Sequence, residues 1–240
     1  MALISDVHGN LPALETVLAE IEAVGVDAVW CLGDLVGYGA QPDECVARAR
    51  EACDLCLVGN HDLVVIDKLS ASDFSPAAAA AALWTRERIG EEAAGFLAGL
   101  EPAELRGEIA LYHGSPRDPV WEYLLSPLQA DASMDVMDAR VGAVGHSHVA
   151  LAFERRGDHA TGQQMPGGTE ADISAGEWLL NPGAVGQPRD GDPRAAWLLL
   201  DLEHSTASWR RAEYPIDRAA AAIRDADLPG ALADRLYYGQ

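Results

Sequence analysis

Short apolar runs, each followed at once by a polar or small residue, recur along this chain. Five of them are bounded by glycine, which is typical of buried strands, and they lie at 3–4, 29–32, 55–58, 109–112 and 141–144. Between the first three runs, apolar residues recur at helical spacing, from a cap at Asn10 to Gly25 and again from Pro42 onward. This alternation predicts a β-α-β-α-β unit, in which parallel strands are joined by right-handed crossovers.

The middle of the chain has a helical pattern, and its last third returns to strands. Residues 64–105 are predicted to be helical, with a cap at Ser75, an alanine-rich helix to Ile89 and a second helix from Glu91 to Leu100. Strands are expected at 109–112, 141–144, 149–154, 177–180, 195–202 and 207–213. Residues 156–170 are expected to form a loop and residues 217–238 two short helices. We predict one domain over residues 1–240, with a helical tail over about 215–240.

The side chains that follow the predicted strands are chemically alike. Because residues just past the carboxyl ends of strands line the ligand crevice of an open α/β sheet, we expect these side chains to gather at one edge. Imidazole and carboxylate ligands in this number suit a pair of divalent metals. Taken singly, each histidine fits equally well as a strand-end residue bonded to backbone, but five together favour metal chemistry. The residues are Asp6, His8, Asp34, Asn60, His61, Asp62, His113, His146 and His148.

The acidic balance of the chain argues against two classes of partner. Its formal net charge of −21 repels nucleic-acid phosphates and anionic lipid headgroups, so we expect no nucleic-acid polymer and no membrane as a partner. A small anionic substrate stays compatible, because bound divalent cations reverse the potential locally. The four cysteines are expected to be free thiols in a reducing, cytoplasmic environment. No apolar run approaches the ~20 residues that a membrane span requires.

Taken in order, the polar blocks resemble the calcineurin-like metallophosphoesterase superfamily, and most of all its small bacterial and archaeal branch. The resemblance implies a four-layer α/β/β/α sandwich, with two mixed β-sheets flanked by helices. It also implies a binuclear metal-dependent phosphoesterase, a hydrolase acting on ester bonds. The blocks that carry it are Asp6-x-His8, Gly33-Asp34, Gly59-Asn60-His61-Asp62, His113, Gly145-His146-Ser147-His148 and a late block from Asn181 to Arg189.

The resemblance assigns roles position by position. A hydroxide between the two metals would be the nucleophile, His61 would protonate the leaving oxygen, and Asp62 would hold the His61 tautomer. Nitrogen and oxygen ligands without thiolate favour Mn or Fe as the metal pair, with Zn, Ni or Co as alternatives. One metal would be held by Asp6, His8, Asp34 and His148, and the second by Asp34, Asn60, His113 and His146, with Asp34 bridging.

One position departs from the family pattern, and three others are candidates for substrate contact. Many family members carry an Asp three residues after the first one in the Gly-Asp block, where this chain has Gly37. We expect the metal site to survive this change and the loop to differ in shape. Asn10 lies at a predicted helix N-terminus, where phosphate binding is favoured. Arg117 and Arg189 each offer a fork for phosphate, with pairing to a neighbouring Asp as the alternative.

The expected function is hydrolysis of a small phosphate ester, with a phosphodiester or nucleotide-type substrate favoured by the resemblance. A phosphoprotein or phosphomonoester phosphatase is the alternative within the class. A non-catalytic metal-binding scaffold on the same fold is the alternative outside it, which the presence of His61 and a full ligand set disfavours. The expected partner is a small phosphorylated substrate, and a homo-oligomer is compatible with the sequence.

Overall fold

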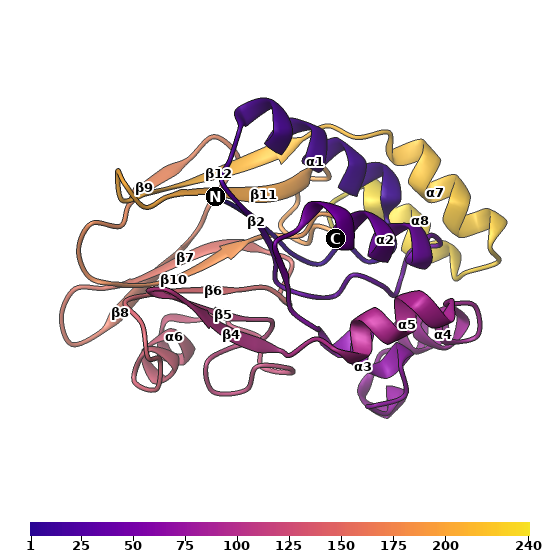
Figure 1. Cartoon of the computed structure of the whole chain (residues 1–240), viewed down its shortest axis with the longest axis horizontal. Coiled ribbons are helices and arrows are strands. Elements are labelled where there is room, and N and C mark those ends of the chain that lie inside the picture. The colour runs from indigo at the N-terminus through magenta and orange to yellow at the C-terminus, as the bar shows by residue number, and fades with distance from the viewer.

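Two six-stranded mixed β-sheets pack face to face at the centre of the molecule (Figure 1). The structure, a computed structural model, describes all residues from 1 to 240. The first sheet has the order β3-β2-β1-β11-β12-β9, with β1 (Ala2–Ile4), β2 (Val29–Cys31), β3 (Leu55–Cys56), β9 (Glu170–Asp172), β11 (Ala195–Asp201) and β12 (Thr206–Ala212). The second has the order β4-β5-β6-β10-β7-β8, with β4 (Ala103–Arg106), β5 (Ile109–Tyr112), β6 (Val141–Val144), β7 (Ala150–Arg155), β8 (Ala160–Gln164) and β10 (Glu177–Pro182).

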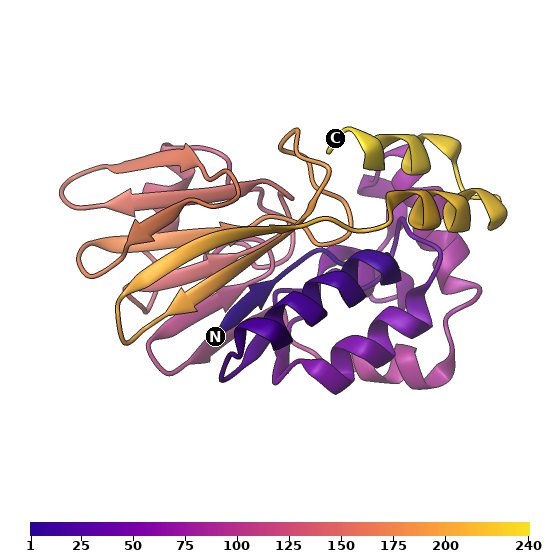
Figure 2. The same cartoon turned by 90° about the horizontal axis from the view of Figure 1, so that it is seen from above.

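Helices cover the outer face of each sheet and complete four layers. On the first sheet pack α1 (Leu11–Val24), α2 (Pro42–Ala52), α7 (Ile216–Asp225) and α8 (Gly230–Asp234), and Figure 2 shows the yellow C-terminal helices near the indigo α1. On the second sheet packs α6 (Pro127–Met134), which contacts β7, β8 and β10. The remaining helices are α3 (Asn60–Val65), α4 (Pro76–Arg86) and α5 (Glu91–Ala98), with 3-10 turns at Ala71–Asp73 and Arg235–Tyr237. The predicted α/β/β/α sandwich is confirmed.

Alternation along the strands divides the apolar side chains between the layers. In β1, Ala2 and Ile4 join the cluster under the helices, whereas Leu3 joins the cluster between the two sheets. In β11, Trp197 faces the helices and Leu198 faces the second sheet in the same way. Because successive side chains of a strand point to opposite faces, both faces of the first sheet are buried. This explains why its strands read as continuous apolar runs rather than alternating ones.

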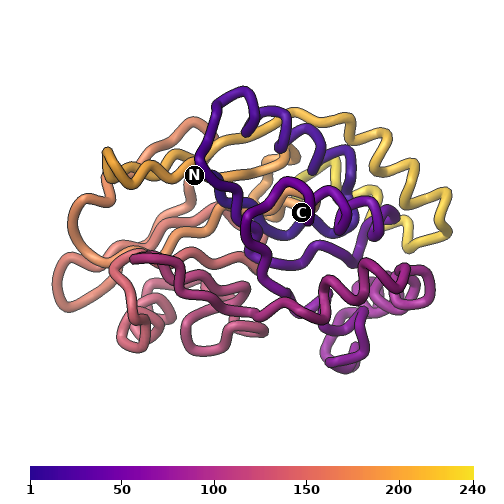
Figure 3. The backbone as a smooth tube through the Cα atoms, in the orientation of Figure 1, coloured from indigo at the N-terminus to yellow at the C-terminus, as the bar shows by residue number.

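The predicted β-α-β-α-β unit is present at the N-terminus. Strands β1, β2 and β3 pair in parallel, and Asn10 caps α1 by accepting a hydrogen bond from the Ala13 N–H. On its other side β1 pairs antiparallel with β11, so the first strand lies beside one from the end of the chain (Figure 3). The parallel strands therefore end at one edge, and their following loops emerge together.

Several elements differ from the sequence prediction, and β4, β8 and α6 show why. Residues 103–106 form β4 rather than helix, and residues 160–164 of the expected loop form β8. Both strands are largely exposed, so neither carries an apolar alternation that a pattern would reveal. Helix α6 was not predicted, although Ser126 caps it and Pro127 occupies its first turn. The cap was therefore present, and the weak apolar pattern of the helix hid it.

The remaining sequence expectations concern cysteines and membrane spans. All four cysteines are free thiols in the structure, and two of them, Cys31 and Cys56, are register partners on adjacent strands. This placement agrees with a structural role rather than a second metal site. None of the helices is both long and apolar enough to span a bilayer.

A buried ion pair ties the late loop after β10 to strand β12. The Arg211 guanidinium donates to the Asp190 carboxylate, and their side chains are only 3% and 1% exposed. Asp190 also accepts a hydrogen bond from the Ala150 N–H at the start of β7. Because removing one partner of a buried pair leaves the other charge uncompensated, this contact fixes the loop strongly.

We predict that Arg211→Ala lowers the free energy of unfolding by about 3–5 kcal/mol, because Asp190 is left buried without its cation. The matched control is Arg194→Ala, which removes a half-exposed guanidinium paired with Asp192 at 2.6 Å. That exposed pair should contribute no more than about 1 kcal/mol. Urea denaturation of both variants measures the difference, and equal losses would contradict the role given to the buried pair.

Candidate metal centre

Seven of the predicted ligands meet at the carboxyl ends of five parallel strands. Each strand belongs to a parallel pair, β1 to β3 in the first sheet and β5 and β6 in the second. The loops that follow these strands bring the side chains together between the sheet edges. None of the seven residues is more than 3% exposed. They are Asp6, His8, Asp34, Asn60, His113, His146 and His148.

The first group of ligand atoms surrounds one point. Nε2 of His8 lies 3.9 Å from Asp6 Oδ1 and 3.5 Å from Asp34 Oδ2. Nε2 of His148 lies 3.4 Å from Asp6 Oδ1. All four ligand atoms are within 4.8 Å of one another. The arrangement fits one cation, because a metal at ~2.0–2.2 Å from each ligand places the ligands about 3–4 Å apart.

The second group shares Asp34 with the first. Nε2 of His113 lies 3.5 Å from Asp34 Oδ2 and 3.2 Å from Asn60 Oδ1. His146 completes the group, and the ligand atoms of Asp34, His113 and His146 lie within 4.8 Å of one another. The same Asp34 oxygen therefore faces both groups, which is the geometry that a carboxylate bridging two ions needs. The predicted ligand set is brought together in full, and in the predicted division.

Backbone carbonyls fix the tautomer of each candidate imidazole. The Nδ1 atoms of His8, His113 and His148 lie 3.1, 2.9 and 2.6 Å from carbonyl oxygens of Val36, Leu32 and Gln187. In His146 it is Nε2 that lies 3.2 Å from the Trp121 oxygen. Since a carbonyl only accepts, the proton sits on that nitrogen and the other nitrogen presents a lone pair. In His8 and His148 these bare Nε2 atoms face each other at 3.0 Å.

In each of the two carboxylates, one oxygen accepts a backbone N–H and the other has no hydrogen-bond partner. Asp6 accepts the His146 N–H with Oδ2, and Asp34 accepts the His61 N–H with Oδ1. The second oxygen of each, Asp6 Oδ1 and Asp34 Oδ2, is buried without any hydrogen-bond partner. A buried charged group without a partner is strongly unfavourable. The orphaned oxygens and facing lone pairs together fit cations, which would satisfy all of them at once.

Burial controls the ionisation of the metal-free cluster. It raises the pKa of Asp6 from 3.8 to about 7, with a smaller upward contribution from the Asp34 charge. Burial also raises the pKa of Asp34 well above its usual value, helped by the Asp62 charge. The pKa values of His8, His146 and His148 are lowered, again mainly by burial. These three imidazoles are therefore neutral and able to act as ligands, whereas the two carboxyls hold protons that a metal must displace.

The backbone under the ligands is left-handed. Asp6, His8, Asp34, His146 and His148 have φ between 50° and 62°, a region that non-glycine residues seldom adopt. They make up most of the nine non-glycine residues with positive φ in the chain. Such conformations cost of order 1 kcal/mol or more each and persist where the surroundings over-determine them. Left-handed residues are concentrated among the candidate ligands. We infer that these loops are shaped by the direction in which the ligand side chains must point, and not by local backbone stability.

His61 lies beside the first group, but its environment differs from the prediction. Its ring centroid is 4.8 Å from that of His8, and its side chain is buried. The expected hydrogen bond from the His61 ring to Asp62 is absent, and the two Asp62 oxygens accept the backbone N–H groups of Val36 and Gly59 instead. His61 Nδ1 has no partner. Asp62 therefore shapes the loop and does not hold the His61 tautomer.

Gly37 explains how the His61 ring fits. A Cβ at this position would lie 2.5 Å from His61 Nδ1, and the residue has φ of +89°. Both the close approach and the left-handed backbone require glycine. The position that departs from the family pattern thus packs directly against His61, and a different loop shape stays a prediction.

The three candidate substrate contacts fall in different surroundings. Asn10 is buried with its amide donating to the Gly186 carbonyl and to the Tyr214 hydroxyl, so its polar atoms are already paired. Arg117 is half-exposed, and its Nη1 lies 3.7 Å from Glu122 Oε1. Its ion-pair partner is therefore Glu122 and not the neighbouring Asp118. Arg189 alone faces the cluster: it has no carboxylate partner, donates to the Tyr38 hydroxyl at 3.2 Å, and lowers the pKa of His61 and His148 by its charge.

Sequence reasoning missed the groups that orient the ligands. The orienting groups are main-chain carbonyls, which every residue possesses, so the sequence carries no signal for them.

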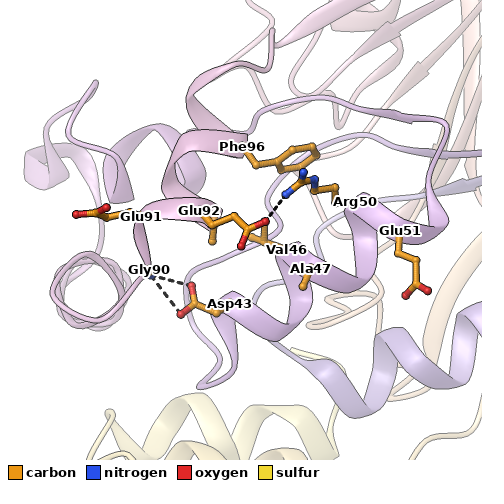
Figure 4. Close-up of a pocket in the computed structure, with 10 residues that line it drawn as sticks. Asp43, Val46, Ala47, Arg50, Glu51, Gly90, Glu91, Glu92 and Phe96 are labelled. Carbon is orange, nitrogen blue, oxygen red and sulfur yellow. Dashed lines mark hydrogen bonds and ion pairs between the residues drawn. The ribbon is translucent and has the colours of Figure 1, made fainter.

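A cavity of about 690 Å³ lies between α2 and α5, lined by Asp43, Arg50 and Phe96 among others (Figure 4). None of its lining residues belongs to the cluster.

Comparisons with known proteins agree with this geometry. The chain is 37% identical to an uncharacterized protein of Methanocaldococcus jannaschii, over 100% of this chain and 98% of that one. The crystal structure of a metallophosphoesterase from Sphaerobacter thermophilus is similar with a TM-score of 0.91 and 38% identity, covering 100% and 98% of the two chains. A hypothetical protein from Pyrococcus horikoshii shares the fold, with a TM-score of 0.81, 22% identity and the same coverage. The profile of the calcineurin-like phosphoesterase superfamily domain matches residues 1–205, and the chain belongs to that superfamily.

Proposed function

We propose that this protein hydrolyses small phosphate esters, phosphodiesters in preference to monoesters, with two divalent ions held by the strand-end cluster. The observation that carries the proposal is the Asp34 oxygen, which is unpaired and lies 3.5 Å from both His8 Nε2 and His113 Nε2. One carboxylate placed between two sets of lone pairs suits a pair of ions better than one. Family membership supports the ester-hydrolysing activity.

The residues present would give each ion a different set of ligands. Asp6, His8 and His148 would complete one site with Asp34, and Asn60, His113 and His146 the other. When bound, such a pair lowers the pKa of a shared water and neutralises the charge of the phosphoryl oxygens. Mn or Fe is favoured, because no thiolate is present to select zinc. The protein contributes fixed ligand directions, since the carbonyls described above lock each imidazole.

His61 is suited to protonate the leaving-group oxygen. Its ring borders the first ligand group at 4.8 Å from His8 and belongs to no ligand group itself. Burial, followed by the Arg189 charge, holds the pKa of His61 well below 6.5, so the ring is neutral in the metal-free protein. Proton transfer needs the protonated ring, and the negative charge of a bound phosphate would favour that form; the ring returns to the neutral state when its proton passes to the leaving oxygen.

Arg189 is placed to bind the phosphate. Its guanidinium is half-buried, lies 5.6 Å from the Tyr38 ring, and pairs with no carboxylate. The guanidinium donates only to neutral acceptors, the Tyr38 hydroxyl and Gln187 Oε1, so its charge is not neutralised by a carboxylate and attracts an anion. A planar guanidinium can contact two phosphoryl oxygens at once. The expected partner is therefore a small phosphorylated molecule.

Turnover of bis-p-nitrophenyl phosphate against p-nitrophenyl phosphate, with Mn²⁺, tests the activity. His61→Ala should lower kcat by about 10²–10⁴-fold while the metal content stays unchanged, because the proton donor alone is lost. His204→Ala is the control, since His204 is 70% exposed and bonded to Asp201. An unchanged kcat in His61→Ala would remove His61 as the acid. Full metal occupancy without turnover of either ester would favour the scaffold alternative.

Asp34→Asn should abolish binding of both ions, because one Asp34 oxygen faces both ligand groups and the substitution removes one of the two carboxylate charges of the cluster. Elemental analysis of dialysed protein measures the loss, with Asp201→Asn as a control at an exposed carboxylate. Retention of two ions per chain by Asp34→Asn would refute the bridging assignment.

Metal binding should release protons near neutral pH. Below about pH 7 Asp6 holds a proton in the metal-free protein, since burial raises its pKa to about 7, and a ligand carboxylate must be ionised. His8, His146 and His148 do not compete, because burial lowers their pKa values. The apparent affinity for Mn²⁺ should therefore fall as pH falls from 7.5 through 7 toward 6. Calorimetry in buffers of different ionisation enthalpy counts the protons, and zero release at pH 6.5 would contradict the account.

A further inference from the structure

Aromatic rings stand against the two histidines on one side of the cluster. The Phe74 ring lies 4.3 Å from the His61 ring with an interplanar angle of 30°. The Tyr123 ring stacks on His146 at 4.1 Å and 12°. Trp121 joins the two, since its ring meets Phe74 edge-on at 5.9 Å and its carbonyl orients His146. Two distant segments of the chain thus place three rings at one edge of the metal centre.

These rings and Arg189 contact different parts of the cluster. Arg189 lies with Tyr38, whose ring is 4.7 Å from that of His8, on the side of the first ligand group. Tyr123 covers His146, which belongs to the second group. The site therefore presents a cationic contact and aromatic contacts around the same cluster, and His61 lies between Tyr38 and Phe74, with ring centroids 4.4 Å from Tyr38 and 4.3 Å from Phe74. A phosphate that carries a flat apolar substituent satisfies both at once.

The exposure of the Tyr123 side chain and the hydrogen bonds of its segment argue against a role limited to core packing. Its side chain is 44% exposed, although one face of the ring is used against His146. Its carbonyl accepts a hydrogen bond from Gln129 Nε2 at 2.8 Å, and the neighbouring Trp121 N–H donates to Asp118 Oδ1 at 3.0 Å. A large ring held rigidly with one face open to water is a common feature of binding surfaces, since little entropy is lost when a ligand covers it.

We propose that Phe74, Trp121 and Tyr123 form a stacking subsite that selects phosphate esters with a planar aromatic substituent, an aryl group or a nucleobase. The proposal rests on the proposed function for the position of the phosphate. Phe74 packs on the residue assigned as proton donor, so a substituent on the leaving oxygen would lie near Phe74. Base–aromatic stacking is sequence-tolerant, because every flat ring presents a π-face. The subsite thus sets a chemical class and not one molecule.

Binding of two inhibitors to the Mn²⁺-loaded protein tests the subsite without turnover. Phenylphosphonate and cyclohexylphosphonate have similar size and the same anion, and they differ in the planarity of the ring. Calorimetry on the wild type should give about tenfold tighter binding of the phenyl compound. In Tyr123→Leu and Phe74→Leu, which keep apolar bulk but lose the ring, the preference should fall to about twofold or less. Leu128→Ala, at an exposed apolar residue near Tyr123 in sequence, should retain it.

Each outcome separates this inference from the proposed function. A wild type that binds both phosphonates equally, or variants that keep the full preference, would overturn the subsite. Selective binding of phenylphosphonate that disappears in both variants supports the subsite even if no ester is hydrolysed, and in that case only the proposed catalysis fails. Hydrolysis of p-nitrophenyl esters with unchanged kcat/KM in Tyr123→Leu and Phe74→Leu would leave the activity standing and overturn the subsite.

Discussion

Two buried carboxylate oxygens without a hydrogen-bond partner, Asp6 Oδ1 and Asp34 Oδ2, are the constraint on which this structure depends. They face imidazole nitrogens that also present lone pairs, so acceptor atoms are concentrated at the centre of the molecule. Burial raises the pKa of both carboxyls, and the Arg189 charge offsets this only in part. The proposed pair of divalent ions removes that conflict. The site is thus built for cations, at a cost to the metal-free fold.

The surrounding fold holds the ligands against that cost. The left-handed backbone of Asp6, His8 and Asp34 directs their side chains inward, and short parallel strands buried on both faces fix where each loop starts. The late loop contributes without supplying a ligand. Its Gln187 carbonyl orients His148, and the Arg211–Asp190 pair anchors the same loop to β12. Arg189, between these anchors, is thereby held near the cluster.

The positions of the ligands were predictable because the physics that sets them is local. A short apolar run ending in a polar residue marks a strand end, and parallel strands end together, so Asp6, Asp34 and His113 could be placed at one edge from sequence alone. The sequence could not reveal contacts that any residue can make. The carbonyls behind the histidines and the pairing of Asp62 with backbone N–H groups belong to this kind. Exposed strands such as β4 escaped detection because they lack an apolar face. Phe74 was not predicted as a site residue, since the sequence around it carries no pattern that indicates its contact with His61.

The central claim is that one carboxylate lies between two ions at the strand ends. Anomalous diffraction from crystals of the Mn²⁺-loaded protein, collected at an energy where manganese scatters anomalously, locates the ions directly. The account predicts two peaks separated by ~3.5–4 Å, one on each side of the Asp34 carboxylate, the first among Asp6, His8 and His148 and the second among Asn60, His113 and His146. A single peak, or a pair that does not share Asp34, would contradict it.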